Sequence, residues 1–170
     1  MFNGDGYDPV NQEMLTKAGV WRIDSTVDAI ARYTADKNVA LFESLKVLNK
    51  DECKARQTVL FNHYIGVVEM EANCLVDMLR QQIIPAVKAA NVGFLEDLQA
   101  SVHSILGGLA AVHHEKDLKT KAGLARKLRL ETMIDVRHTV DAAEAVVPAN
   151  LWPLATYKEL LFLDQHIKDV

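Results

Sequence analysis

The chain has 170 residues, of which 49% are hydrophobic and 25% are charged, and its formal net charge is −4. These values are typical of one folded domain and exclude an intrinsically disordered chain. The mild negative charge gives no indication of nucleic acid or an anionic membrane surface as a partner. Because glycine and proline are scarce, with 8 and 4 residues, the composition favours helices.

Membrane insertion and secretion are both disfavoured by the sequence. No apolar run approaches the roughly 18 residues that a membrane-spanning helix needs, and the polar first residues do not resemble a signal peptide. Cys53 and Cys74 lie 21 positions apart. On one continuous helix they would be about 30 Å apart, too far for a disulfide. We therefore expect a soluble protein of a reducing compartment, the cytoplasm or an organelle stroma.

Short helices are expected before residue 50. Asp8-Pro9 is typical of a helix start and Gly19 of a helix end, and Ser25 with Asp28 predicts the start of a second helix. A third helix is predicted from about residue 35 to residue 45. Its inward side chains would be Val39, Phe42 and Leu45.

A much longer helix is predicted from residue 50 to about residue 91, with Asn49 as its N-cap. Its apolar residues recur at steps of three and four: Phe61, Ile65, Val68, Ala72, Leu75, Leu79, Ile83, Ala86 and Ala90. A second row widens this face: Leu60, Tyr64, Val67, Cys74 and Met78. Such a helix would be about 60 Å long, and Pro85 should kink its last turns.

Two further long helices are expected to return along the first. The apolar positions of residues 94–113 are Leu95, Leu98, Val102, Ile105, Leu109 and Val112. Those of residues 118–147, before Pro148, are Leu124, Leu128, Met133, Val136, Val140, Ala143 and Val147. Gly107-Gly108 indicates either close packing or a bend. We predict an all-α fold, a long-helix antiparallel bundle or hairpin (residues 50–147) after short helices (residues 1–49) and before a tail (residues 148–170).

The tail contains closely spaced aromatic residues. Residues 151–154 are predicted to be extended and apolar, and Thr156 with Glu159 forms a capping box that opens a short helix. We predict that this tail docks onto another surface. The candidate docking residues are Trp152, Pro153, Tyr157, Leu160, Leu161 and Phe162.

No complete catalytic motif is present in the sequence. Gly4-Asp5-Gly6 lacks the strand and further glycines of a phosphate-binding loop, and no nucleophile elbow or metal-spaced cysteine pair occurs. The metal-ligand candidates are Asp135 and His138, which share a helix face at i and i+3. Three residues of the long helix could complete such a site: His63, Glu69 and Glu71. Ordinary solvated or locally hydrogen-bonded side chains explain this set better.

Six basic residues lie between residues 116 and 129 with one acid, Asp117. A basic helix can bind phosphates. Leucines interleave at helical spacing, however, and no aromatic residue accompanies them, so a solvated helix face is the favoured interpretation. The preceding His113-His114-Glu115 is more typical of a polar helix end than of a ligand set.

Residues 151–162, read as LWPLATYKELLF, resemble the C-terminal signature of type III glutamine synthetases, WPxPTYx(E/D)LLF. Two departures are Leu151 in place of a tyrosine and Leu154-Ala155 in place of an aromatic-proline pair. Residues 3–7 resemble the point where that family's chain leaves its catalytic barrel. Further similar segments are residues 38–43 (NVALFE), Val47-Leu48, Glu71-Ala72 with Met78, and residues 84–87 (IPAV).

The resemblance implies a helical C-terminal region that lacks the upstream catalytic barrel. In that family the barrel binds ATP and two divalent metal ions, magnesium or manganese, and ligates ammonia to glutamate. None of those positions lies in this chain, so the resemblance implies no catalytic, cofactor or metal residue here. It implies as partners the catalytic domain and neighbouring subunits of a homo-oligomer. Two alternatives stay open: a free-standing bundle with a metal site, and an independent protein-interaction module.

Overall fold

Residues 4–162 are described by the computed structural model, and within this range the chain forms helices and no strand. The all-α prediction is confirmed. The chain divides into two compact units, Met1–Phe61 and Asn62–Val170, and the helix α4 (Lys50–Met78) contributes residues to both. No helix in the described range is long and apolar enough to cross a membrane.

The first two helices of the first unit begin at capping side chains that the sequence predicts. The Asp8 carboxylate accepts a hydrogen bond from the Val10 N–H at 2.9 Å and starts α1 (Pro9–Lys17). Gly19 follows with φ +81°. The Ser25 hydroxyl accepts from the Asp28 N–H at 3.1 Å and starts α2 (Thr26–Ala31). These short polar side chains satisfy N–H groups that a helix start leaves without partners.

The core of the first unit forms around α2, the 3₁₀ turn η1 (Arg32–Thr34), α3 (Asp36–Ser44) and the first turns of α4. Its buried apolar side chains are Val27, Ile30, Val39 and Cys53. The rings of Tyr33 and Phe42 lie 5.7 Å apart between centroids. The Gln57 amide of α4 donates to the carbonyls of Ile30 and Ala31 at 3.0 and 3.3 Å, satisfying acceptors at the end of α2.

The predicted inward face of α3 was only partly right. Val39 is buried and Phe42 is half-buried, but Leu45 is 63% exposed. Leu45 is the C-cap of α3, and the next residue, Lys46, has φ +55°. The chain turns away from the helix at this point, so Leu45 no longer continues the face that α3 buries.

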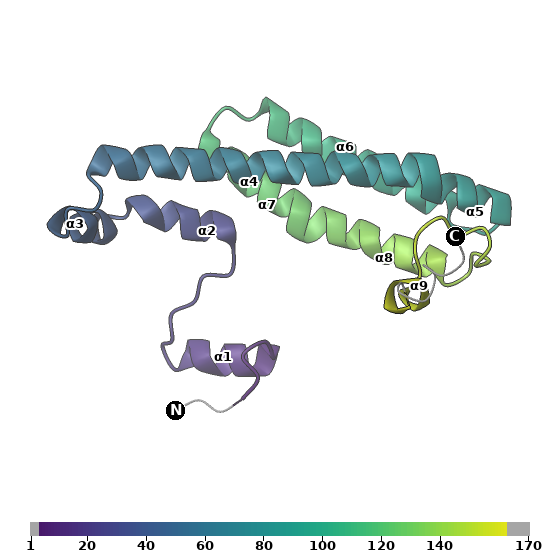
Figure 1. Cartoon of the computed structure of the whole chain (residues 1–170), viewed down its shortest axis with the longest axis horizontal. Coiled ribbons are helices and arrows are strands. Elements are labelled where there is room, and N and C mark those ends of the chain that lie inside the picture. Colours follow the sequence, from purple (N-terminus) through teal and green to yellow (C-terminus); the bar gives the residue numbers. More distant parts are fainter. Residues whose placement is uncertain (1–3, 163–170) are drawn as a thin grey trace. The chain divides into compact units, whose positions relative to one another are not determined.

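In the second unit, a long helical run continues from α4 through η2 (Leu79–Ile83) and α5 (Ile84–Ala90). The helix α6 (Leu95–His114) returns antiparallel to it. A third leg then runs antiparallel to α6 and consists of α7 (Leu118–Lys127), η3 (Leu128–Thr132) and α8 (Met133–Glu144) (Figure 1). Asn91 makes the first reversal possible because it adopts the left-handed conformation, with φ +53°. The antiparallel long-helix arrangement predicted from the sequence is confirmed.

Both η2 and η3 are π-helical turns, and η2 ends two residues before Pro85. Proline has no N–H and its ring would meet the carbonyl four residues earlier. The preceding Ile84 N–H donates to the Leu79 carbonyl, which is the wider π-type hydrogen bond. The disturbance expected at Pro85 therefore takes the form of a π turn within a continuous run.

The buried face of the long run agrees with most of the predicted stripe. Phe61, Ile65, Val68, Ala72, Leu79, Ile83 and Ala86 are buried. Val76 and Val87 are also buried, although the predicted stripe did not include them. In the second row Tyr64 is buried, whereas Leu60 and Cys74 are exposed and were wrongly placed inward.

Within the Gly107-Gly108 pair, Gly108 serves close packing. A Cβ atom built on Gly108 would lie 2.7 Å from Leu128 Cδ1, whereas one on Gly107 would meet nothing within 4 Å. Leu128 is in η3 and is buried. Glycine at residue 108 thus lets α6 and η3 approach closely.

Candidate docking surfaces

The first candidate surface is α1, none of whose residues is buried. The side chains of Tyr7, Val10 and Met14 are 91%, 72% and 48% exposed. Local hydrogen bonds order the segment before the helix, because the Asn11 and Gln12 amides donate to the carbonyls of Asp5 and Gly6. An ordered helix that displays apolar side chains and buries none is typical of a surface that packs on something else.

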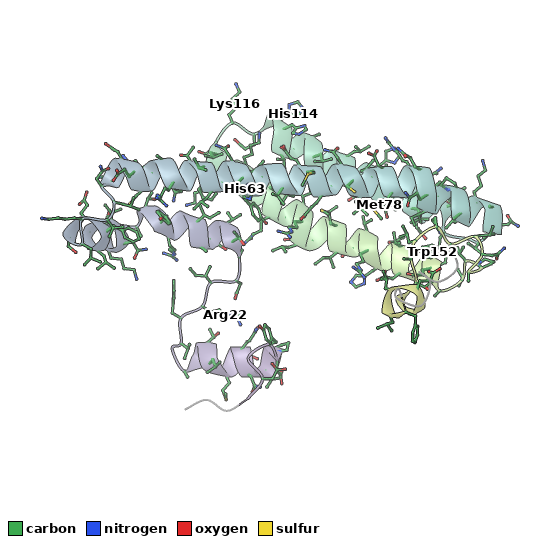
Figure 2. The ribbon with its side chains drawn as sticks, viewed as in Figure 1. Arg22, His63, Met78, His114, Lys116 and Trp152 are labelled. Atoms are coloured by element: carbon green, nitrogen blue, oxygen red, sulfur yellow. The ribbon has the colours of Figure 1, made fainter. Side chains whose placement is uncertain are left out.

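A second apolar group of the first unit follows α1. Trp21 is 69% exposed, and the Lys37 ammonium lies 5.8 Å from its ring centroid. Its neighbour Arg22, labelled in Figure 2, bonds to Asp24 at 2.6 Å and to the Gln12 side chain at 3.0 Å. The sequence analysis did not single out Tyr7, Val10, Met14 or Trp21. A sequence signal could have identified them: several large apolar side chains lie in a segment that is too short to bury them.

The second unit carries the predicted docking tail. Its first part is a turn, in which the N–H groups of Leu151 and Trp152 donate to the Pro148 carbonyl at 2.8 and 3.2 Å. Trp152, labelled in Figure 2, is 9% exposed and lines a pocket with residues of α4 and α8. Pro153 is exposed. Trp152 thus anchors the tail within its own unit.

The helix α9 (Tyr157–Leu161) presents apolar side chains to solvent. Leu160, Leu161 and Phe162 are 57%, 76% and 46% exposed. The predicted capping box is confirmed: the Glu159 N–H donates to Thr156 Oγ1 at 3.3 Å, and the Thr156 N–H donates to the Glu159 carboxylate at 2.6 Å. The side chain of Tyr157, also predicted to dock, lies outside the described part of the chain.

The metal-ligand candidates are not brought together into a larger set. Asp135 and His138 are both exposed on α8. Glu69 instead accepts from His113 of α6 at 3.3 Å, and Glu71 pairs with Arg129 of η3 at 3.3 Å. Among the described residues, no group of three His, Cys, Asp or Glu side chains could hold a metal ion. The two glutamates link α4 to its neighbours.

The turn between α6 and α7 is a polar helix end, as the sequence indicates. The Glu115 carboxylate accepts from the N–H groups of Lys116 and Asp117 at 2.7 and 2.8 Å. Asp117 caps α7 and accepts from the Thr120 hydroxyl at 2.7 Å and from its N–H at 2.9 Å. These two bonds, the hydroxyl bond foremost, lower the pKa of the Asp117 carboxyl. Figure 2 shows His114 and Lys116 at this turn.

The basic segment lies mainly on the surface of α7. Lys116, Lys119 and Lys127 are exposed, and Lys121, Arg126 and Arg129 are half-buried. Arg129 pairs with Glu71, and Ala122 and Ala125 are the fully buried residues of α7. The basic side chains therefore flank a buried small-residue face.

Residues 1–105 match the family model for the glutamine synthetase C-terminal domain. The chain belongs to this family. It is 27% identical to a type-3 glutamine synthetase of Dictyostelium discoideum, over 96% of this chain and 27% of that protein. Glutamine synthetases of Bacteroides fragilis (strain YCH46) and Butyrivibrio fibrisolvens are 21% and 22% identical over 95% of this chain. The chain thus spans about a quarter of the length of the curated relatives it matches, 27% of each.

Membership of this family agrees with the resemblance seen in the sequence motifs. The matched relatives are glutamine synthetases, and the matched family is described as their C-terminal domain. Two features of the chain then need an explanation in that context: the exposed apolar side chains of α1, and those of α9.

Proposed function

We propose that this chain is a packing domain of a type III-like glutamine synthetase, and that it contributes contacts to the assembled enzyme but no catalytic residue. The catalytic domain of the parent protein and neighbouring subunits of a homo-oligomer would be its partners. ATP and magnesium or manganese would be bound by the parent's catalytic domain. This assignment implies the compartment expected from the sequence, the cytoplasm or an organelle stroma.

The observation that carries the proposal is the exposure of large apolar side chains on α1 and directly before it. Val10 and Met14 lie one helical turn apart and are 72% and 48% exposed, next to Tyr7 at 91%. Fully burying one such side chain stabilises a complex by about 1.5–3 kcal/mol. Since α1 buries no residue of its own, docking would bury apolar area at little cost in rearrangement.

The apolar end of α9 supports the proposal independently. Leu160 and Leu161 of α9 and the following residue, Phe162, are exposed, and the Thr156–Glu159 capping box fixes the start of this helix. A preorganised helix loses less conformational entropy on binding than a flexible segment does. The tail can therefore act as a second contact of the same packing domain.

The test begins with the DNA upstream of the codon for Met1. We expect a continuous reading frame that encodes a synthetase barrel. The 170-residue chain should bind the polypeptide encoded upstream when the two are mixed. The double variant Val10→Ser/Met14→Ser should weaken this binding at least about tenfold, from the loss of two buried apolar contacts.

The control variant is Glu13→Gln/Lys17→Gln, which removes an exposed ion pair of the same helix and should leave binding unchanged. A chain that fails to bind the upstream polypeptide would contradict the packing role. Glutamine formation from glutamate, ammonia and ATP by the purified chain alone would contradict the non-catalytic role. We expect no such activity at any metal concentration.

An independent interaction module would also use the exposed apolar side chains, but it would not be part of a glutamine synthetase. A promoter and ribosome-binding site directly before the codon for Met1 would favour it. The alternative of a metal-binding bundle depends on Asp135 and His138. Stoichiometric iron, manganese or zinc that is lost in His138→Ala would favour that alternative, and a metal-free protein would exclude it.

A further inference from the structure

A pocket of about 430 Å³ lies in the second unit, between α4, α8 and the tail. Its apolar lining consists of Leu75, Met133, Val140, Trp152, Leu154 and Leu160, with Ala155 beside them. A volume of this size is within the range of small-molecule sites, which are concave and mostly apolar with a few polar groups. Neither the family match nor the proposed packing role assigns a ligand to it.

The charged residues of the described pocket lining come from α8. Arg137, Asp141 and Glu144 follow one another at helical spacing. Arg137 Nε lies 3.5 Å from Asp141 Oδ2, so these two charges offset each other. Glu144 has no cationic partner among the side chains that the structure describes. The charged residues of the described lining, one cation and two carboxylates, therefore sum to one negative charge.

The backbone adds to this negative potential. The helix α8 ends at Glu144, and Asp141 and Glu144 lie in its last turn. This last turn contains no basic residue. The carbonyl groups of a helix C-terminus carry partial negative charge and favour a cation. The carboxylate and the helix end thus act in the same direction at one end of an apolar cavity.

We propose that this pocket binds a small amphipathic amine, with its aliphatic body against Leu75, Val140 and Trp152 and its ammonium group beside Glu144. The aliphatic part gains from burial along the apolar lining. The ammonium group gains from the carboxylate and from the helix end. An aliphatic carboxylate of the same length would bring its charge next to Glu144 and be repelled.

The test uses Trp152 as its reporter. The chain has two tryptophans, and Trp21→Phe leaves Trp152 as the only one. Hexylamine, hexanol and hexanoate, which share their alkyl length, are titrated at pH 7 while tryptophan emission is recorded. The change in tryptophan emission should saturate with hexylamine. Hexylamine should bind about three- to tenfold more tightly than hexanol, because its ammonium group gains an exposed charge pair and a helix end. Hexanoate should bind more weakly than hexanol.

The matched variants assign the preference to one carboxylate. Glu144→Gln should remove the advantage of hexylamine over hexanol and leave the binding of hexanol unchanged. Glu131→Gln, at an exposed glutamate of η3 outside the pocket lining, should keep the full advantage. Absence of a saturable response to hexylamine, equal affinities for hexylamine and hexanoate, or the same preference in Glu144→Gln would each overturn the proposal.

Discussion

At the scale of single residues, adjacent glycines in α6 have opposite roles. Gly107→Ala should raise the stability of the chain by about 1 kcal/mol, because alanine is the better helix former and a new methyl group meets nothing within 4 Å. Gly108→Ala brings the same propensity gain but places its methyl group 2.7 Å from Leu128 Cδ1. Overpacking of this kind costs about 1–3 kcal/mol.

Chemical denaturation of the two alanine variants measures this difference directly. Gly108→Ala should be about 1–3 kcal/mol less stable than Gly107→Ala. The double variant Gly108→Ala/Leu128→Ala should recover part of the packing strain while losing the buried leucine. Equal stabilities for the two single variants would show that Leu128 moves aside freely, contrary to this prediction.

Asp117 should make the start of α7 sensitive to acid. Its pKa is lowered in the folded chain from an ordinary value of 3.8, chiefly by the Thr120 hydroxyl. A lowered pKa stabilises the fold above the ordinary value, and that stabilisation is lost as the pH falls through the folded value. Asp117→Asn keeps an acceptor but cannot titrate.

Thermal unfolding at a series of pH values tests the role of this carboxyl. We expect Asp117→Asn to be less stable than the parent chain at pH 6 and to approach it as the pH falls below the ordinary value of 3.8, where the parent's carboxyl protonates. A parent–variant difference that is the same at all pH values would contradict the prediction.

At the scale of elements, the stability of the long helical run should depend on its buried face. Leu79 is fully buried in η2, and its neighbour Arg80 is exposed. Leu79→Ala should cost about 2–5 kcal/mol, because it removes buried methyl groups and leaves a cavity. Arg80→Ala should stay within about 0.5 kcal/mol of the parent. Similar losses from both variants in urea unfolding would argue against this packing of η2.

Helix starts could be predicted from the sequence because they depend on neighbouring residues. Besides Asp8 and Ser25, Asn49 caps α4, since its side chain accepts from the Asp51 and Glu52 N–H groups at 3.0 and 2.9 Å. The π turns could not be predicted in this way. Val87 lies four residues after Ile83 and Ala86 three, so a regular helical period allows both positions, and both are buried although the predicted stripe included only Ala86.

At the scale of the whole molecule, the family and the helical class were accessible from the sequence, but the candidate sites were less so. The tail motif identified Trp152, which is buried, together with Leu160, Leu161 and Phe162, which are exposed. Nothing in the pattern separates an anchor from a displayed side chain, because burial depends on contacts with distant residues. The pocket beside Trp152 was missed for the same reason, since its lining comes from α4, α8 and the tail.

The exposed apolar side chains also predict how the isolated chain behaves in solution. With Leu161 76% and Val10 72% exposed and no partner present, we expect reversible self-association, seen as a weight-average mass that rises with concentration in sedimentation equilibrium. Sulfate should strengthen this association, because it favours the burial of apolar surface. Sodium chloride should weaken it little, since charge pairs are not its main cause.

Variants of each unit show which surface is responsible. Leu161→Lys/Phe162→Ser should lower the association if α9 mediates it, and Val10→Ser/Met14→Ser should do so if α1 does. Combining the four substitutions should give a monomer at concentrations where the parent chain associates. Arg80→Ser changes an exposed polar residue and should have no effect. At about 100 μM, a contact with a binding free energy of about −5.5 kcal/mol is substantially populated. A parent chain that stays monomeric at this concentration would show that these side chains do not form a docking surface by themselves.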